Sequence, residues 1–287
     1  MKELGQRFWT SLLSFLVLLA ILWVGLSALF PLIIVICLIA LREYVDMLHL
    51  RDIEVRKGSL MVFGVLLIAA SALGTQENLG GWEVPWPGGS WREVVMGVYV
   101  VYVLVVELTN PGERPLERIV YSLFGMLYIP WLLGYFLLLR QTPSEAYGFG
   151  YLLLPLMASF ATDTGGFFLG RFFGKRKLAP EVSPAKTIEG AIGGLFSSFL
   201  FVFGVSYILE RNGLIHHTRI LDIFLFSILV SCAAQLGDLA ESLIKRSLGA
   251  KDSGAFLPGH GGLLDRLDSL LFAVPITYIY LSLVAFR

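Results

Sequence analysis

Charged side chains crowd into residues 242–268, between two segments that are apolar enough to span a bilayer. The stretch reads SLIKRSLGAKDSGAFLPGHGGLLDRLD and holds Lys245, Arg246, Lys251, Asp252, His260, Asp265, Arg266 and Asp268. Placing charge beside a membrane is costly, so this density predicts a multiply charged partner. Carboxylates interleaved with lysines and arginines are suited to holding phosphates together with a metal ion.

Within this stretch, a tight turn is predicted from Pro258, Gly259, Gly261 and Gly262. Its exposed N–H groups could approach phosphate oxygens. Asp265 and Asp268 follow at i and i+3, on neighbouring surface at the start of the last apolar segment. Carboxylates without a Cys or His cluster favour Mg²⁺ over Zn²⁺. His260 is either a functional group or a structural hydrogen-bonding residue.

Three further polar elements lie in or beside apolar runs. Asp163, in ATDTGGFFLGR, costs about 3 kcal/mol at mid-membrane on insertion scales, so it either serves a site or pairs with Lys or Arg between helices. Ser183, Lys186 and Thr187 precede a glycine-rich helix start, which makes an anion-binding helix N-terminus plausible. The neighbouring Lys175–Lys177 run is typical of a topology signal.

The third element is a polar face on the eighth predicted span. Asp238, Glu241, Ser242 and Lys245 recur at i, i+3, i+4 and i+7, which places them on one side of a helix. They form either a ladder of ion pairs at the membrane interface or part of the same site. Asp238 lies well inside the span, which favours the site. Together these elements are typical of phosphoryl or nucleotidyl transfer to a lipid-embedded acceptor.

The composition decides the class of protein that must position these residues. The 287 residues are 56% hydrophobic and 15% charged, whereas a soluble domain carries about 25% charged residues. The chain is therefore predicted to be an integral membrane protein. Its net charge of zero argues against a nucleic-acid partner.

Nine transmembrane helices are expected. No charge interrupts residues 8–41, which as one helix would measure about 51 Å against a hydrocarbon core of about 30 Å. Gly25, Ser27 and Pro31 therefore predict a hairpin of two spans there. The other expected spans are 58–74, 94–108, 119–139, 148–169, 188–208, 220–244 and 270–286.

This pattern predicts an all-α, polytopic membrane bundle forming one domain over residues 1–287. Residues 1–147 would supply N-terminal membrane helices. Residues 148–287 would supply the catalytic helices and the loops that carry the polar motifs described above. With nine spans, 17 of the 22 Lys and Arg residues fall on the side of the N-terminus. The N-terminus and the loops of the site are therefore predicted to be cytoplasmic. Without a visible organelle-targeting segment, a multi-pass protein of the bacterial inner membrane is expected.

The motif Ser242-x-x-Lys245-Arg246-x4-Lys251-Asp252, followed by PGHGGLLDRLD, resembles the signature of phosphatidate cytidylyltransferases, the CDP-diacylglycerol synthases. Similarity extends back through SPAKTIEG to about Asp163. The family usually has Ser-Pro-Lys-Lys-Thr where this chain has Ala185, so Lys186 must serve alone. The resemblance implies Mg²⁺-dependent conversion of CTP and phosphatidate into CDP-diacylglycerol and pyrophosphate in phospholipid biosynthesis.

Site residues follow from the motif and its resemblance together. The candidate catalytic residues are Asp265, Asp238, Lys245, Lys251 and His260. The candidate substrate-binding residues are Ser183, Lys186, Thr187, Ser242, Arg246, Gly259, Gly261, Gly262 and Arg266. Asp238 and Asp265 are the expected metal ligands, with Asp268 and Asp163 for a second cation.

Three further expectations concern partners and alternatives. The resemblance implies a homodimer embedded in the lipid bilayer. The same cytidylyl transfer to an ether-linked, archaeal-type phosphatidate is an alternative. A secondary transporter is another, although the polar groups cluster at one face and no inverted repeat is visible.

Overall fold

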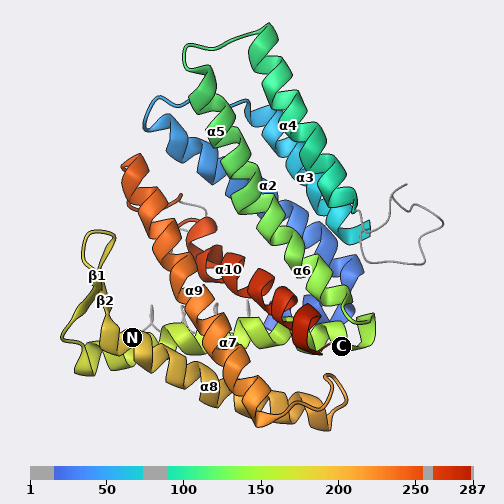
Figure 1. The fold of residues 1–287 in the computed structure, drawn as a ribbon, viewed down its shortest axis with the longest axis vertical. Coiled ribbons are helices and arrows are strands. Elements are labelled where there is room, and N and C mark those ends of the chain that lie inside the picture. The colour runs from blue at the N-terminus through green and yellow to red at the C-terminus, as the bar shows by residue number, and fades with distance from the viewer. Residues whose placement is uncertain (1–15, 74–89, 255–260, 286–287) are drawn as a thin grey trace.

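The computed structural model describes residues 16–73, 90–254 and 261–285. They form a bundle of helices, as Figure 1 shows. Six of the described helices are long and apolar enough to cross a membrane, and Lys57–Leu73 is a shorter apolar helix. The chain is thus an all-α polytopic membrane protein, as predicted, but these six helices do not establish the expected nine spans.

The N-terminal part of the bundle follows the predicted spans over 58–74, 94–108 and 119–139 closely. After a short helix over 16–24, it comprises α2 (Leu26–His49), α3 (Lys57–Leu73), α4 (Trp91–Thr109), α5 (Pro115–Met126), the π-helix η1 (Leu127–Trp131) and α6 (Leu132–Gln141). η1 contains Pro130, whose ring cannot fit a regular helical hydrogen-bond ladder.

The predicted hairpin within residues 8–41 needs correction. Helical geometry is interrupted at Gly25, where φ is 103°, but Pro31 lies inside α2. α2 also continues to His49, so Glu43 is helical and not part of a connecting loop over 42–57. Apolar length alone does not mark where a helix ends, because polar residues can continue it once neighbouring helices bind them. Residues 8–15 of the predicted hairpin lie outside the described part of the chain.

The C-terminal part carries the motifs. It comprises α7 (Glu145–Phe173), β1 (Lys177–Ala179), β2 (Ser183–Thr187), α8 (Ile188–Arg211), α9 (Ile220–Leu248), α10 (Leu264–Tyr280) and the π-helix η2 (Leu281–Ala285). β1 and β2 form an antiparallel hairpin that the sequence did not predict, with Lys177 opposite Thr187 and Ala179 opposite Ser183. Thr187 ends the hairpin and caps α8 by accepting a hydrogen bond from the Gly190 N–H at 3.1 Å.

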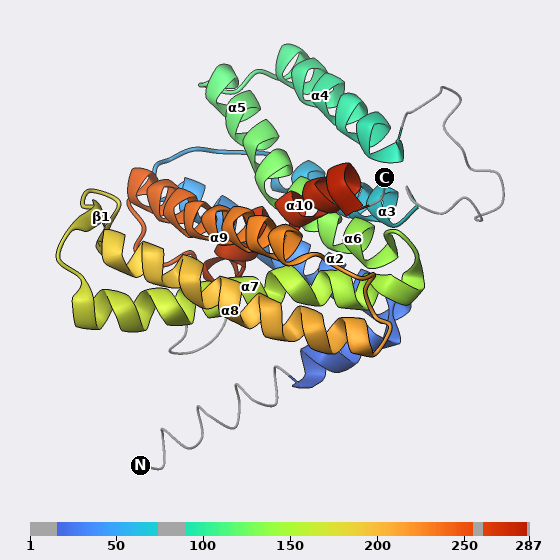
Figure 2. The same ribbon diagram turned by 60° about the horizontal axis from the view of Figure 1, so that its bottom comes forward.

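Figures 1 and 2 both show α7 and α8 side by side, with α9 and α10 packed against them. Small residues permit the close approach of α7 and α8. A Cβ atom on Gly190 would lie 2.8 Å from the carbonyl oxygen of Gly166, so a larger residue there would push the two helices apart. α9 also contacts α2, which links the two parts of the bundle.

Candidate functional site

A cavity of about 430 Å³ opens where α7, the β-hairpin, α8 and α9 meet. Four residues singled out from the sequence line it: Asp163, Lys186, Thr187 and Asp238. They come from α7, β2 and α9. The fold therefore brings together polar groups that lie up to 75 positions apart in the chain.

Lys186 and Asp238 form an ion pair across this cavity. The Lys186 Nζ and Asp238 Oδ2 atoms are 2.5 Å apart, and the two side chains are 25% and 30% exposed. Asp163 and Asp268 both lie within electrostatic range of Asp238. Asp238, which pairs with Lys186, thus has a further carboxylate within electrostatic range on α7 and another on α10.

A second cluster lies further along α9. The Lys245 Nζ atom is 2.5 Å from Glu241 Oε2 and 2.5 Å from Asp265 Oδ1, and Glu241 is only 1% exposed. Glu241 and Lys245 form an i, i+4 ion pair, which is one of the pairs expected if this face of the helix is a ladder of ion pairs. Asp238 does not continue that ladder, because it pairs with Lys186 on another element.

Asp265 binds groups from three neighbouring parts of the chain. Its Oδ2 atom accepts hydrogen bonds from the Gly262 N–H at 2.8 Å and the Ser253 N–H at 3.0 Å, while Oδ1 binds Lys245. The Ser253 N–H also lies 3.3 Å from Oδ1, so each oxygen of Asp265 already has two contacts, which is about as many as a carboxylate oxygen accepts. Asp268 lies one helical turn further along α10 and accepts a bond from the Ser269 N–H.

The other predicted residues divide between the surface and the undescribed loop. Arg246 and Lys251 are exposed and form no ion pair within the described ranges, and Ser242 and Ser183 are half-buried. Arg266 lies in the first turn of α10, and Gly261 adopts a positive φ of 81°. Gly259 and His260 lie outside the described residues.

Sequence reasoning missed two residues that contact this region, Glu43 and Ser253. Glu43, on α2, accepts hydrogen bonds from the Leu263 and Leu264 N–H groups, each at 2.8 Å. The Ser253 hydroxyl donates to Glu43 Oε2 at 3.3 Å. Nothing in the sequence distinguished Glu43 from its charged neighbours Arg42 and Asp46, because its partners lie about 210–221 positions away.

The described residues contain no group of three His, Cys, Asp or Glu side chains placed to hold a metal ion by themselves. The oxygen donors around Asp238 are nevertheless the type that hard cations prefer. Mg²⁺ ordinarily takes one or two protein carboxylates and completes its shell with water and phosphate oxygens. The carboxylates present therefore fit a cation that is also bound by a phosphate ligand.

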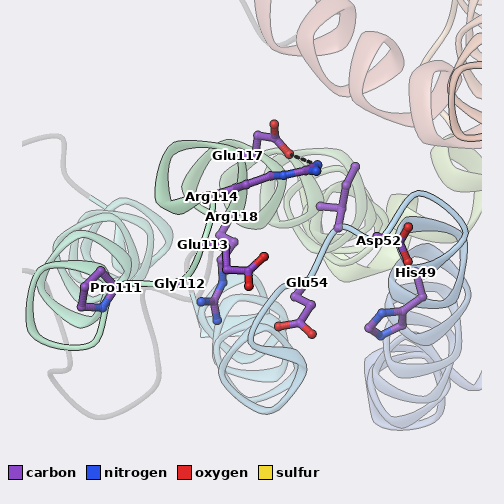
Figure 3. A pocket seen from close by; sticks show the side chains of 10 residues that line it. His49, Asp52, Glu54, Pro111, Gly112, Glu113, Arg114, Glu117 and Arg118 are labelled. Atoms are coloured by element: carbon purple, nitrogen blue, oxygen red, sulfur yellow. Dashed lines mark hydrogen bonds and ion pairs between the residues drawn. The ribbon is translucent and has the colours of Figure 1, made fainter.

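Another cavity, of about 520 Å³, lies between the α2–α3 and α4–α5 connections (Figure 3). Its lining mixes both signs of charge, including Glu54, Glu113 and Arg118. Arg114 and Glu117, which also line it, pair at 3.5 Å. None of the residues predicted from the motifs lines this cavity, so it does not belong to the candidate site.

Comparison with known proteins gives one consistent result. The model of the cytidylyltransferase family matches residues 5–284. Proteins named phosphatidate cytidylyltransferase from Staphylococcus aureus (strain COL) and Staphylococcus haemolyticus (strain JCSC1435) are each 32% identical to the chain over 279 residues. These alignments cover 96% of this chain and 98% of each relative. The chain therefore belongs to the cytidylyltransferase family.

Proposed function

We infer that this protein is a phosphatidate cytidylyltransferase, which converts CTP and phosphatidate into CDP-diacylglycerol and pyrophosphate. Relatives that align with nearly the whole chain have this name. The observation that carries the chemistry is the cavity in which Lys186 and Asp238 pair beside Asp163. Neither the ether-lipid alternative nor the transporter is favoured by the relatives' names.

The reaction exchanges one phosphorus–oxygen bond for another. An oxygen of the phosphatidate phosphate bonds to the α-phosphorus of CTP, while the bond from that phosphorus to the β-phosphate oxygen breaks and pyrophosphate leaves. The attacking phosphate is already an anion, so no strong general base is required. The principal difficulty is the repulsion between two polyanions, which positively charged groups at the site must offset.

Lysines and arginines supply part of that positive charge. Lys186 and Lys245 lie among the carboxylates, where we assign them to the reacting phosphates. Arg246, in the last turn of α9, and Lys251, three residues after the end of that helix, are both exposed and would bind the triphosphate together with Arg266. Ser183, Thr187 and Ser242, with the Gly259, Gly261 and Gly262 backbone and His260, remain assigned to substrate binding and catalysis.

Membership of the family suggests dependence on a divalent cation, and we propose Mg²⁺. When bound, this cation would neutralise charge on the triphosphate and the leaving pyrophosphate. We assign Asp238 and Asp268 first to this cation and Asp163 to a second one. Both oxygens of Asp265 already accept from Lys245, Ser253 or Gly262, so we assign Asp265 first to holding Ser253 and Gly262 and second to the metal.

The lipid substrate is proposed to enter sideways from the bilayer. Phe167 lines the cavity beside Asp163 and is 59% exposed, which supports an apolar opening between helices. Phe167→Trp should then slow turnover of long-chain phosphatidate more than that of a short-chain soluble analogue. Equal slowing of both substrates would argue against this route.

We further propose a homodimer in the bacterial inner membrane, with the site on the cytoplasmic face. The excess of Lys and Arg on the side of the N-terminus supports this orientation. Burial of two basic residues on the other side adds to the difference between the two membrane faces. Two of the five basic residues assigned to the opposite side, Arg92 and Arg140, are buried in the bundle and are 5% and 6% exposed. Cross-linking of single surface cysteines in intact cells would test both the orientation and the dimer.

The decisive experiment follows cytosine-tritiated CTP into extractable lipid. Detergent-purified protein, phosphatidate and Mg²⁺ should give labelled lipid and one pyrophosphate per label, and EDTA should stop the reaction. Ether-linked phosphatidate in a parallel reaction tests the alternative acceptor. Folded protein that binds CTP but labels neither lipid would contradict the proposed activity.

A further inference from the structure

We propose that Glu43 is a positioning residue of this cytidylyl transfer, which fixes Ser253 and the start of α10 and, through them, Asp265. The inference rests on the proposed function for its kinetic consequence. Its structural part stands on contacts alone. Glu43 is 6% exposed and belongs to α2, the helix that links the N-terminal helices to α9.

The N–H groups at the start of α10 lack a hydrogen-bond acceptor from the helix's own N-cap side chain. The first N–H groups of a helix lack intrahelical partners, and the N-cap residue of α10 is Leu263, whose side chain cannot accept a hydrogen bond. The two oxygens of Glu43 accept the Leu263 and Leu264 N–H groups at 2.8 Å each. A carboxylate is favoured there because a helix N-terminus carries partial positive charge.

Ser253 extends this anchor to the site. Its hydroxyl donates to Glu43 Oε2 and accepts from the Asp265 N–H, each at 3.3 Å. Its own N–H donates to Asp265 Oδ2 at 3.0 Å. Since Asp265 binds Lys245, a continuous set of contacts leads from Glu43 to the charged cluster on α9.

Packing is close where Gly262 passes Glu43. A Cβ atom on Gly262 would lie 2.8 Å from Glu43 Oε2, so the backbone approaches the carboxylate as closely as glycine permits. Asp268 lies one turn along the same helix, and its position therefore also depends on how α10 begins. Glu43 lines neither of the cavities described above and acts through Asp265 and Asp268.

Glu43→Gln tests this role with the least change in volume. The glutamine NH₂ group cannot accept an N–H, so one of the two α10 amides loses its partner. We expect kcat to fall about 10- to 100-fold, because a displacement of about 1 Å can cost 10²-fold. The KM for CTP should change by less than about threefold, since the hydrogen bonds that Glu43 accepts in the described part of the chain come from Ser253, Leu263 and Leu264 and not from Arg246 or Lys251.

Glu107→Gln is the matched control. Glu107 is also 6% exposed, but it binds Arg56 and Arg118 in the N-terminal part of the bundle. Glu107→Gln should lower the melting temperature while kcat per folded protein stays within about twofold of the parent. If Glu43→Gln behaves like this control, Glu43 merely stabilises the bundle and the proposal is wrong.

Hydrogen exchange separates this proposal from the proposed function. In Glu43→Gln the amides of residues 261–268 should exchange faster than in the parent, while those of α3 and α4 should not change. Unchanged exchange at 261–268 would overturn the anchor, whatever reaction the protein catalyses. An inactive parent protein would contradict only the proposed function, because the exchange measurement does not depend on turnover.

Discussion

Two charge networks, one in each part of the bundle, differ in their balance of acidic and basic groups. In the N-terminal network, the single carboxylate of Glu107 is shared by Arg56 and Arg118, with Nε–Oε1 distances of 3.3 Å and 3.6 Å. The Gly112 N–H donates to the other oxygen at 3.3 Å. Each oxygen of this carboxylate is bound within the protein.

The C-terminal network is unbalanced in the opposite direction. This region holds five carboxylates but only two ammonium groups; the carboxylates belong to Asp163, Asp238, Glu241, Asp265 and Asp268, and the ammonium groups to Lys186 and Lys245. Even with Arg171 lining the cavity, acidic groups exceed basic ones. Excess negative charge within a membrane protein is expensive unless a cation joins it. The excess of negative charge is what we expect of a site that binds a cation, whereas the N-terminal network has the composition of a structural tie.

The largest effect should come from removing a carboxylate of the unbalanced network. Asp238→Asn and Asp268→Asn should each lower kcat by about 10³-fold, the scale on which single electrostatic groups act in catalysis. Folding should be retained, because fewer like charges remain together. Label transfer at several Mg²⁺ concentrations measures the loss, and Asp46→Asn on the exposed part of α2 is the control. Normal turnover in either variant would remove that residue from the assigned site.

Asp265→Asn should combine two effects. Turnover should fall by about 10²- to 10³-fold, and thermal stability should also fall, because Lys245 keeps only Glu241 and the Gly262 N–H faces a weaker acceptor. Melting curves and kcat measured on the same preparation distinguish this variant from Asp238→Asn. A variant that lost turnover with an unchanged melting temperature would show that Asp265 acts on substrate or metal and not on the loop.

Disrupting the N-terminal network around Glu107 should leave the rate of cytidylyl transfer unchanged. Glu107→Gln removes the charge that Arg56 and Arg118 share, which should cost about 1–3 kcal/mol of stability. Cytidylyl transfer by the folded fraction should continue at the parent rate. If kcat fell along with stability, the two networks would be coupled and the distinction between them would fail.

The smallest effect is expected at the surface. Arg114 and Glu117 pair at 3.5 Å with side chains 60% and 46% exposed, so Glu117→Gln should change stability by less than about 0.5 kcal/mol. Both the melting temperature and turnover should match those of the parent. A large change in either would indicate that the cavity in Figure 3 has a role that the charge comparison does not include.

The sequence by itself determined the class of fold, the family and most of the polar groups at the site. Apolar runs placed α3 to α10 to within a few residues at most ends, because a membrane span needs a length that is visible in the sequence. Helical periodicity likewise placed Asp238, Glu241 and Lys245 on one face of α9. These are local properties, which neighbouring residues decide.

Only the tertiary structure decided which charges meet. The pairing of Lys186 with Asp238 joins a strand to a helix, and Glu43 reaches α10 across more than 200 positions. A charge at the end of an apolar helix looks the same in sequence whether it faces lipid headgroups, a neighbouring carboxylate or a helix N-terminus. The identity of its partner depends on how the helices pack, because electrostatic and hydrogen-bond energies depend on distances that sequence separation does not set.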